Sequence, residues 1–418
     1  MPITAQELGR RIRSAREVCG LTQEHVAAGL GVSRSAVAQI EAGKRSVSSL
    51  ELDQIAHLCG RDIRELVAES FDEADTLAAL FRAQSDVLAD PAVADALRTC
   101  VALGREITTL EQLLGIDRGM VALAAYSPAV PGSRGQAIQQ GEHLASEERR
   151  RLGLGDAPLP DLEELLEMQG IRTGIVNLPE DVSGLTLNDR RCGLFVVVNR
   201  AHPALRRRFS FAHEYAHVLA DRERFGLVSR ASERGNLIEM RANAFGASFL
   251  LPEQGVRNFV ASLGKGMPSR ISSDVFDEVE SLDVETRMAP GSQTLQLYDV
   301  VQVAHYFGVS RISALYRLRN LRLLSQPELE RLKSLEATGN GKKLAAHLGL
   351  GEPPAPRERD GFRHRVLSLA LEAYRREEIS LGKLYELAAR LDASRDLVDT
   401  LIDDADLADP SLFAEPEQ

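Results

Sequence analysis

The sequence has few cysteines and no long hydrophobic run, and each absence narrows the class of protein. Its four cysteines, Cys19, Cys59, Cys100 and Cys192, form no C-x-x-C pair, which argues against a disulfide framework and a cysteine zinc site. No segment approaches the roughly 18 apolar residues that span a membrane, and the N-terminus lacks the apolar segment of a signal peptide. We therefore expect a cytoplasmic protein without a membrane partner, whose cysteines are ordinary buried thiols.

The length and composition indicate a globular protein with more than one domain. A chain of 418 residues exceeds what a single hydrophobic core usually supports. Apolar residues make up 44% of the chain and charged residues 27%, which is ordinary for a soluble protein and excludes a disordered chain.

Charge is unevenly distributed along the chain. The net charge of −11 would by itself argue against nucleic acid as a partner. Residues 1–47, however, contain more basic than acidic side chains. The basic ones are Arg10, Arg11, Arg13, Arg16, Arg34, Lys44 and Arg45, and the acidic ones are Glu7, Glu17, Glu24 and Glu41. A basic module is thus attached to an acidic body, and a locally positive face suffices to meet phosphate.

The stretch between Arg206 and Ala220 carries the clearest chemistry. It contains His213-Glu214-Tyr215-Ala216-His217, and residues four apart lie on the same face of an α-helix, so both imidazoles can reach one metal ion. Glu214 lies roughly 100° further round the helix, beside the metal. A base beside metal-activated water suits hydrolysis, and H-E-x-x-H is the signature of zinc metallopeptidases.

A structural interpretation of the same stretch stays open. A buried helix could use both histidines to hydrogen-bond to backbone, and the apolar neighbours Phe211, Val218 and Leu219 fit either interpretation.

The N-terminal residues have the pattern of short helices separated by glycine turns. We expect helices over 5–18, 22–30 and 34–42, with Thr22 and Ser33 as N-caps. The order G-L-T-Q-E-x-V-A…L-G-V-S-R-S-A-V-A-Q-I-E-A-G-K-R resembles the phage-repressor-like (XRE-type) helix-turn-helix family over about residues 6–67. A helical bundle used only for protein contacts is the alternative.

The XRE-type resemblance implies which residues contact double-stranded DNA. Gln23 would bond a backbone phosphate, and Lys44 and Arg45 would hold phosphates. The residues expected to approach base edges in the major groove are Ser33, Arg34, Ser35 and Gln39. Because such proteins usually read two half-sites of an operator, we expect a homodimer.

The residues between the two motifs are helical in pattern. Apolar residues recur at helical spacing through 70–145, and the segment YSPAVPGSRGQA marks a linker. We expect the second folded unit to begin near Ile138. Helices over 142–154 and 159–166 and strands over 171–178 and 194–199 are expected to follow.

The segment from Gly153 to Leu219 resembles the ImmA/IrrE family of metallopeptidases over its whole length. Two histidines leave a catalytic zinc ion one protein ligand short. In this family the third ligand is the glutamate that opens E-x-x-A-N-x-F-A-x-x-L-L-x-P. The match runs from Glu239 to Pro252, with Gly246 and Phe249 as departures, so the resemblance implies Glu239 as the ligand. Glu233 is the competing candidate, although its neighbours resemble a loop.

The chain beyond Pro252 carries less chemistry. Residues 256–297 read as a mixed stretch with a mobile loop, and 300–323 resemble another helix-turn-helix. A similar segment follows the metallopeptidase motif in the family, so we expect a structural role, with Tyr316 and Leu318 packed; a second DNA reader is the alternative. Residues 362–403 should form two or three helices before an acidic tail.

The expected fold is mainly α with a small β-sheet (α+β). We expect an XRE-type DNA-binding domain over 1–69, a helical connector over 70–137 and a zincin-like core over 138–260. A helical extension over 261–350 and a C-terminal helical region over 351–418 complete the chain.

Two functions compete. The first is a DNA-binding transcriptional regulator with a zinc endopeptidase that cuts a repressor-type protein. Zn²⁺ would be held by His213, His217 and Glu239, with Glu214 as the catalytic base. The second is a transcription factor whose zincin-like domain senses a ligand or partner with little or no proteolysis. A purely structural zinc domain fits worst, since such sites close with four protein ligands. His305 and Tyr306 could stabilise the oxyanion by residue type alone.

Overall fold

The structure is a computed structural model. It describes residues 3–18, 21–59, 63–67, 91–116, 124–189, 193–221, 227–230, 235–266, 270–276, 281–287, 289, 291–350, 361–391 and 393–405. Helices predominate around a small sheet, so the predicted fold class is confirmed. No helix in this part of the chain is long and apolar enough to cross a membrane.

Five helices form the N-terminal unit. They are α1 (Ala5–Val18), α2 (Gln23–Leu30), α3 (Arg34–Glu41), α4 (Ser49–Leu58) and α5 (Ile63–Val67). Thr22 and Ser33 accept hydrogen bonds from backbone N–H groups of the first turns of α2 and α3, as the sequence predicts. Gly31 ends α2 with φ 65°, a conformation that favours glycine. The unit has its own core, to which Ile12, Val26, Val37 and Ile40 belong.

The four-stranded sheet has the order β1-β3-β2-β4. Its strands are β1 (Arg172–Val176), β2 (Val182–Asp189), β3 (Gly193–Asn199) and β4 (Leu227–Arg230). β1 runs parallel to β3, while β2 pairs antiparallel with both β3 and β4. The sequence predicted β1 and β3 from their β-branched runs. β2 and β4 were not predicted, because β2 contains a glycine and polar ends and β4 has only four residues.

One face of the sheet is covered by the helix that carries H-E-x-x-H. This helix is α10 (Ala204–Ala220), and it packs with α8 (Arg134–Arg151), α9 (Leu162–Met168) and α11 (Leu237–Leu250). Val196 and Val198 of β3 share a core with Phe211 and Tyr215 of α10. α8 begins eight residues before the predicted start at Glu142, since Ser133 caps it. α9 begins at Leu162, capped by Asp161.

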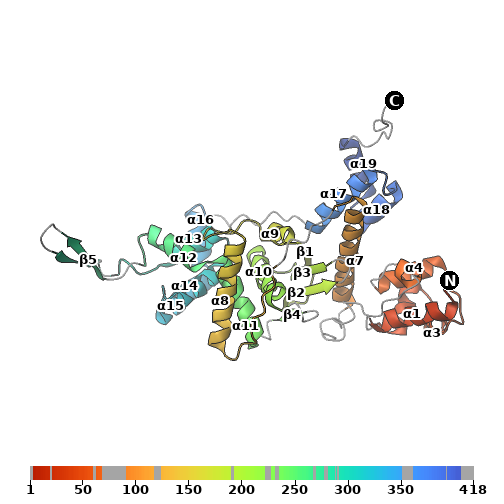
Figure 1. Ribbon diagram of the computed structural model, residues 1–418, viewed down its shortest axis with the longest axis horizontal. Helices are drawn as coiled ribbons and strands as arrows, with labels where there is room; N and C mark the ends of the chain where they lie inside the picture. Colours follow the sequence, from red (N-terminus) through yellow and green to blue (C-terminus); the bar gives the residue numbers. More distant parts are fainter. Residues whose placement is uncertain are drawn as a thin grey trace.

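The opposite face of the sheet is covered by helices from two distant parts of the chain. They are α7 (Pro91–Leu113), α17 (Gly361–Arg375), α18 (Leu381–Ala389) and α19 (Arg395–Asp404). Phe195 and Val197 of β3 and Leu185 and Leu187 of β2 join this second core. Figure 1 shows α7 beside the sheet, with α17 and α18 at its upper end. The predicted connector and C-terminal helices are therefore parts of one layer.

The remaining elements lie at the end of the molecule away from α7 (Figure 1). They are α12 (Glu253–Ser262), a hairpin of β5 (Arg270–Phe276) and β6 (Ser281–Arg287), α13 (Leu297–Phe307), α14 (Arg311–Asn320), α15 (Gln326–Ala337) and α16 (Asn340–His347). The sequence reading of 256–297 missed α12 and the hairpin. α13 and α14 form the expected helix-turn-helix, with Gly308 at the turn. Leu318 is buried as expected, but Tyr316 is 46% exposed, so its predicted packing is wrong.

Candidate metal centre and DNA-reading helix

Helix α10 presents three candidate functional residues to the interior of the protein. His213, Glu214 and His217 are all buried, at 5%, 0% and 1% exposure. Their neighbours Phe211 and Tyr215 anchor the helix in the core, so the side chains that face the site are held by packing on either side.

Helix α11 brings Glu239 to the two histidines. Nε2 of His213 lies 3.2 Å from Nε2 of His217 and 3.1 Å from Oε2 of Glu239. Nε2 of His217 lies 3.3 Å from Oε1 of Glu239. Ligand atoms about 2.0 Å from a tetrahedral ion are about 3.3 Å apart. The three side chains therefore fit the spacing of metal ligands. They form a buried His-His-Glu group, which we call the metal group.

Both imidazoles are oriented by a second set of side chains. Nδ1 of His213 donates to Oδ1 of Asn243 at 3.1 Å, and Nδ1 of His217 donates to Oδ2 of Asp221 at 3.0 Å. Each ring thereby directs its Nε2 lone pair into the site. Arg241 in turn donates to Oδ1 of Asp221 at 2.6 Å. When both rings are neutral, the two Nε2 lone pairs face one another and repel unless a cation lies between them, so this donor set suits a metal ion.

The ionisation of the group points the same way. Burial lowers the pKa of His217, but hydrogen bonds with Asp221 and Glu239 outweigh it and raise the pKa to about 10. Burial raises the pKa of Glu239, but hydrogen bonds with His213 and His217 outweigh it and hold the pKa well below its usual range. Carboxylates in this pocket stabilise positive charge at the place where a metal ion would bind.

Glu214 lies beside this group with one carboxylate oxygen uncommitted. Thr186 of β2 donates to Oε2 at 2.7 Å, whereas Oε1 is buried with no hydrogen-bond partner in the described part of the chain. Burial raises the pKa of Glu214, which makes the carboxylate a better proton acceptor. Gly184 leaves room for it, since a Cβ there would lie 2.9 Å from Oε1.

Sequence reasoning identified the residues of the metal group and missed those that position it. Asn243 stands inside the same motif as Glu239, so the motif could have indicated it. Asp221 follows α10 directly, four residues after His217, so helical spacing could have indicated it. Thr186 and Ser229 carry no motif signal, because strands β2 and β4 bring them to the site. Glu233, the competing ligand, lies outside the described residues, as do Cys19 and Cys192. Cys59 is buried, as predicted.

The two oxyanion candidates, His305 and Tyr306, lie on α13, whereas the metal group lies on α10 and α11. Tyr306 is 48% exposed and stacks on Phe259 with ring centroids 4.3 Å apart. No hydrogen bond joins His305 or Tyr306 to His213, His217 or Glu239 in the described part of the chain.

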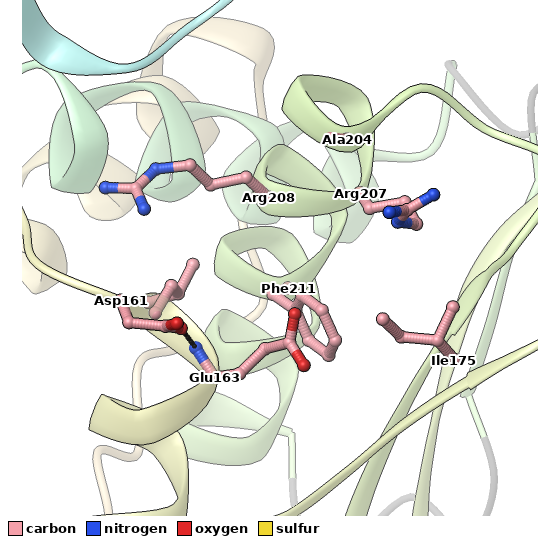
Figure 2. A pocket seen from close by; sticks show the side chains of 8 residues that line it. Asp161, Glu163, Ile175, Ala204, Arg207, Arg208 and Phe211 are labelled. Atoms are coloured by element: carbon pink, nitrogen blue, oxygen red, sulfur yellow. Dashed lines mark hydrogen bonds between the residues drawn. The ribbon is translucent and has the colours of Figure 1, made fainter. Parts of the chain in front are cut away.

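A separate pocket lies near the start of α10 (Figure 2). It is lined by Asp161, Leu162, Glu163, Ile175, Ala204, Arg207, Arg208 and Phe211. Arg208 donates to the carbonyl oxygens of Leu159 and Pro160 at 2.8 and 3.0 Å, and therefore ties α10 to the segment before α9. Acidic and basic side chains balance around this pocket, and it contains none of the metal group.

The predicted base-reading residues share an exposed face of α3. Ser33, Arg34, Ser35 and Gln39 are all exposed. A recognition helix needs these positions free to enter the major groove.

The predicted phosphate contacts have different surroundings. Lys44 is exposed, while Arg45 is half-buried and pairs with Glu51 at 2.7 Å. Nε2 of Gln23 donates to Glu41 at 2.9 Å, which links the start of α2 to α3.

The second helix-turn-helix uses its arginines within the protein. Arg311 pairs with Glu336 of α15 at 2.6 Å, and Arg317 pairs with Glu142 of α8 at 2.7 Å. These contacts favour the structural interpretation of α13 and α14.

The fold and site together define a DNA-binding helical module joined to a metallopeptidase-like domain. Comparison with protein families agrees: residues 7–69 match a helix-turn-helix domain, and residues 167–268 match an IrrE N-terminal-like domain. The chain therefore carries a helix-turn-helix domain followed by an IrrE N-terminal-like metallopeptidase domain. Comparisons with curated proteins and with solved structures find no match.

Proposed function

We propose that this protein is a transcriptional regulator whose zinc endopeptidase domain hydrolyses a peptide bond in a repressor-type protein. The observation that supports it best is the buried group of His213, His217 and Glu239 with the free oxygen of Glu214 beside it. A structural zinc site would have no use for such a base.

Each residue of the site has a role in this proposal. His213, His217 and Glu239 would hold the zinc ion, which would supply Lewis-acid chemistry for the hydrolysis. Glu214 takes the proton of the attacking water and returns it to the leaving amine. Thr186 holds the far oxygen of Glu214 through its 2.7 Å hydrogen bond, so that Oε1 faces the reacting groups.

The N-terminal unit directs this activity to DNA in the proposal. Arg34 and Gln39 read bases from α3 with Ser33 and Ser35, while Gln23, Lys44 and Arg45 hold the backbone. We propose a cytoplasmic homodimer on a two-fold operator, with the DNA-binding domain over 1–69 and the peptidase core over 138–260.

A second candidate function is a sensor in which the metal domain reports a ligand or partner to the DNA-binding end. The contact between α7 and the sheet favours it. α7 precedes the metal domain in sequence and packs on β3 through Gly104, at the back of the sheet that holds Glu214. A protease that cuts a separate repressor does not need a DNA-binding domain in its own chain, whereas a sensor that regulates transcription does.

One variant separates the two functions. Glu214→Gln should retain zinc and DNA binding, because neither the metal group nor α3 changes. If proteolysis is the working function, derepression in cells and cleavage of the target protein both disappear. Normal promoter regulation by Glu214→Gln would reject the peptidase proposal in favour of the sensor. Glu253→Gln, on the exposed start of α12, is the matched control.

A further inference from the structure

Ser229 lies on the edge strand β4, and its hydroxyl faces the metal group. The residue is 2% exposed. Its Oγ lies 3.1 Å from Nε2 of His213, the same distance that separates this nitrogen from Glu239. Ser229 therefore contacts a candidate metal ligand, and it pairs across the sheet with Gly184, beside which Oε1 of Glu214 lies.

The 3.1 Å contact with His213 is one that a fourth metal ligand would make. In a tetrahedral site, the fourth ligand atom lies about 3.3 Å from each of the other three. A water molecule in that position must also lie within hydrogen-bonding distance of the base. A serine hydroxyl has two acceptor lone pairs, as water does, and so can take the same position.

The backbone of β2 and β4 is built to hold Ser229 there. Ser229 pairs with Gly184, so the two residues point to the same side of the sheet, and the missing side chain of Gly184 leaves the space that Glu214 uses. The register of the two strands shifts between Val182 and Gly184. Ser183, within this irregularity, donates its hydroxyl to the carbonyl oxygen of Ser229 at 3.1 Å. Such bulges re-aim side chains beside active sites.

We propose that Ser229 Oγ completes the coordination of the metal ion and closes the site against water. The inference rests on the proposed metal binding and adds a regulatory step to it. β4 must shift before a substrate and water can reach the metal. The strand is suited to moving, since it is an edge strand of four residues that pairs only with β2 among the described strands. A signal that displaces β4 would thus switch the peptidase on.

Cobalt spectroscopy tests the proposed position of Ser229. Co²⁺ is loaded into the full chain, where the visible absorption of tetrahedral cobalt reports binding at the His-His-Glu group. Ser229→Cys should add an intense thiolate-to-cobalt absorption in the near ultraviolet, because its sulfur would lie within bonding distance. Ser248→Cys is the matched control: Ser248 is 5% exposed on α11 and its hydroxyl has no hydrogen-bond partner in the described part of the chain. This control should show no such band.

The outcomes separate the inference from the proposed function. If Ser229→Cys binds cobalt and shows no thiolate band, Ser229 is not a ligand and the inference is wrong, while the metal site stands. If the wild-type chain binds no cobalt, the metal site itself is wrong.

A second variant tests whether Ser229 closes the site. Acetohydroxamic acid binds open positions on a metal ion, and its affinity for the cobalt-loaded protein needs no knowledge of the substrate. If the closed state holds about 90% of the molecules, Ser229→Ala should tighten binding about tenfold. Ser229→Thr keeps a hydroxyl and should bind as the wild type does. Unchanged or weaker binding by Ser229→Ala, together with normal cobalt loading, would overturn the proposal.

Discussion

His213 and His217 depend on residues that the H-E-x-x-H motif does not contain. Their Nδ1 atoms are held by Asn243 and Asp221, and Asp221 is itself held by Arg241. An imidazole with a fixed tautomer and orientation is a better metal ligand, since no rotation must be frozen when the metal binds. The chemistry of the site therefore extends over α10, α11 and the residue after α10.

Removing a ligand should reduce the metal content more than removing a residue that orients a ligand. We expect the wild-type chain to hold about one zinc ion and Glu239→Ala to lose most of it, because a protein ligand is removed. Asp221→Ala should weaken zinc binding by about 10- to 100-fold without removing a ligand. Competition with a chromophoric chelator measures both. Glu253→Ala is the control, and full zinc retention by Glu239→Ala would move the third ligand elsewhere.

The buried carboxyl of Glu214 should make the metal-free protein less stable as pH rises. Burial raises its pKa, so the folded state binds the proton more tightly than the unfolded state does. The free energy of unfolding is therefore highest below the ordinary pKa of a glutamate, where Glu214 is protonated in both states. It falls as the pH rises from there towards the pKa of Glu214 in the folded state. Glu214→Gln removes this cost and should stabilise the metal-free protein at neutral pH by about 1 to 3 kcal/mol. Urea unfolding of the wild type and of Glu214→Gln at neutral and acidic pH measures this effect. An equal difference in unfolding free energy at both pH values would contradict a raised pKa of Glu214.

At the scale of the element, α3 combines an exposed face with a firmly held inner face. Val37 and Ile40 are buried, and the buried Glu41 pairs with Arg16 of α1 at 2.5 Å. This pair fixes α3 against α1, so the outward residues project from a rigid support. The sequence pattern predicted both faces of the helix, because apolar periodicity over eight residues is a local signal.

Variants of this unit should divide into two classes. Replacing Arg34 and Gln39 together by alanine should flatten the preference between operator and random DNA, because base contacts carry the sequence information. Lys44→Ala should weaken binding to all DNA and reduce the salt slope by about 1. Fluorescence anisotropy over a salt series distinguishes them, and an unchanged sequence preference in the double variant would refute the recognition-helix assignment.

At the scale of the whole molecule, α7 joins segments that the sequence keeps far apart. Its Glu111 accepts hydrogen bonds from Arg172 of β1 at 3.4 Å and from Arg365 of α17 at 2.7 Å. Glu106 on the same helix pairs with Lys383 of α18 at 3.1 Å. The sequence reading assigned these helices to a connector and a separate C-terminal region. Charge pairs over more than 250 residues leave no local pattern, so only the folded chain reveals them.

The contact between α7 and the sheet requires a glycine. A Cβ at Gly104 would lie 1.9 Å from the ring of Phe195 in β3, so Gly104→Ala should destabilise the protein by about 1 to 3 kcal/mol through overpacking. Thermal unfolding measures the loss, and Phe195→Leu in the same chain should restore part of it. Gly135→Ala, where nothing lies within 4 Å of the added Cβ, is the matched control. Equal changes in stability for Gly104→Ala and Gly135→Ala would show that helix propensity, and not packing against Phe195, causes the effect.

The sequence alone was enough to predict the helix-turn-helix with its caps, the H-E-x-x-H helix, and the motif that contains Glu239 and Asn243. These features depend on residues close together in the chain, where spacing on a helix decides which side chains meet. Tertiary structure alone decided the rest. It set Thr186 beside Glu214, brought Ser229 to His213 on a four-residue strand, and united α7 with the C-terminal helices behind the sheet. These contacts join segments that are short or far apart in the chain, so no local sequence pattern predicts them. They form only when the segments pack around a common core.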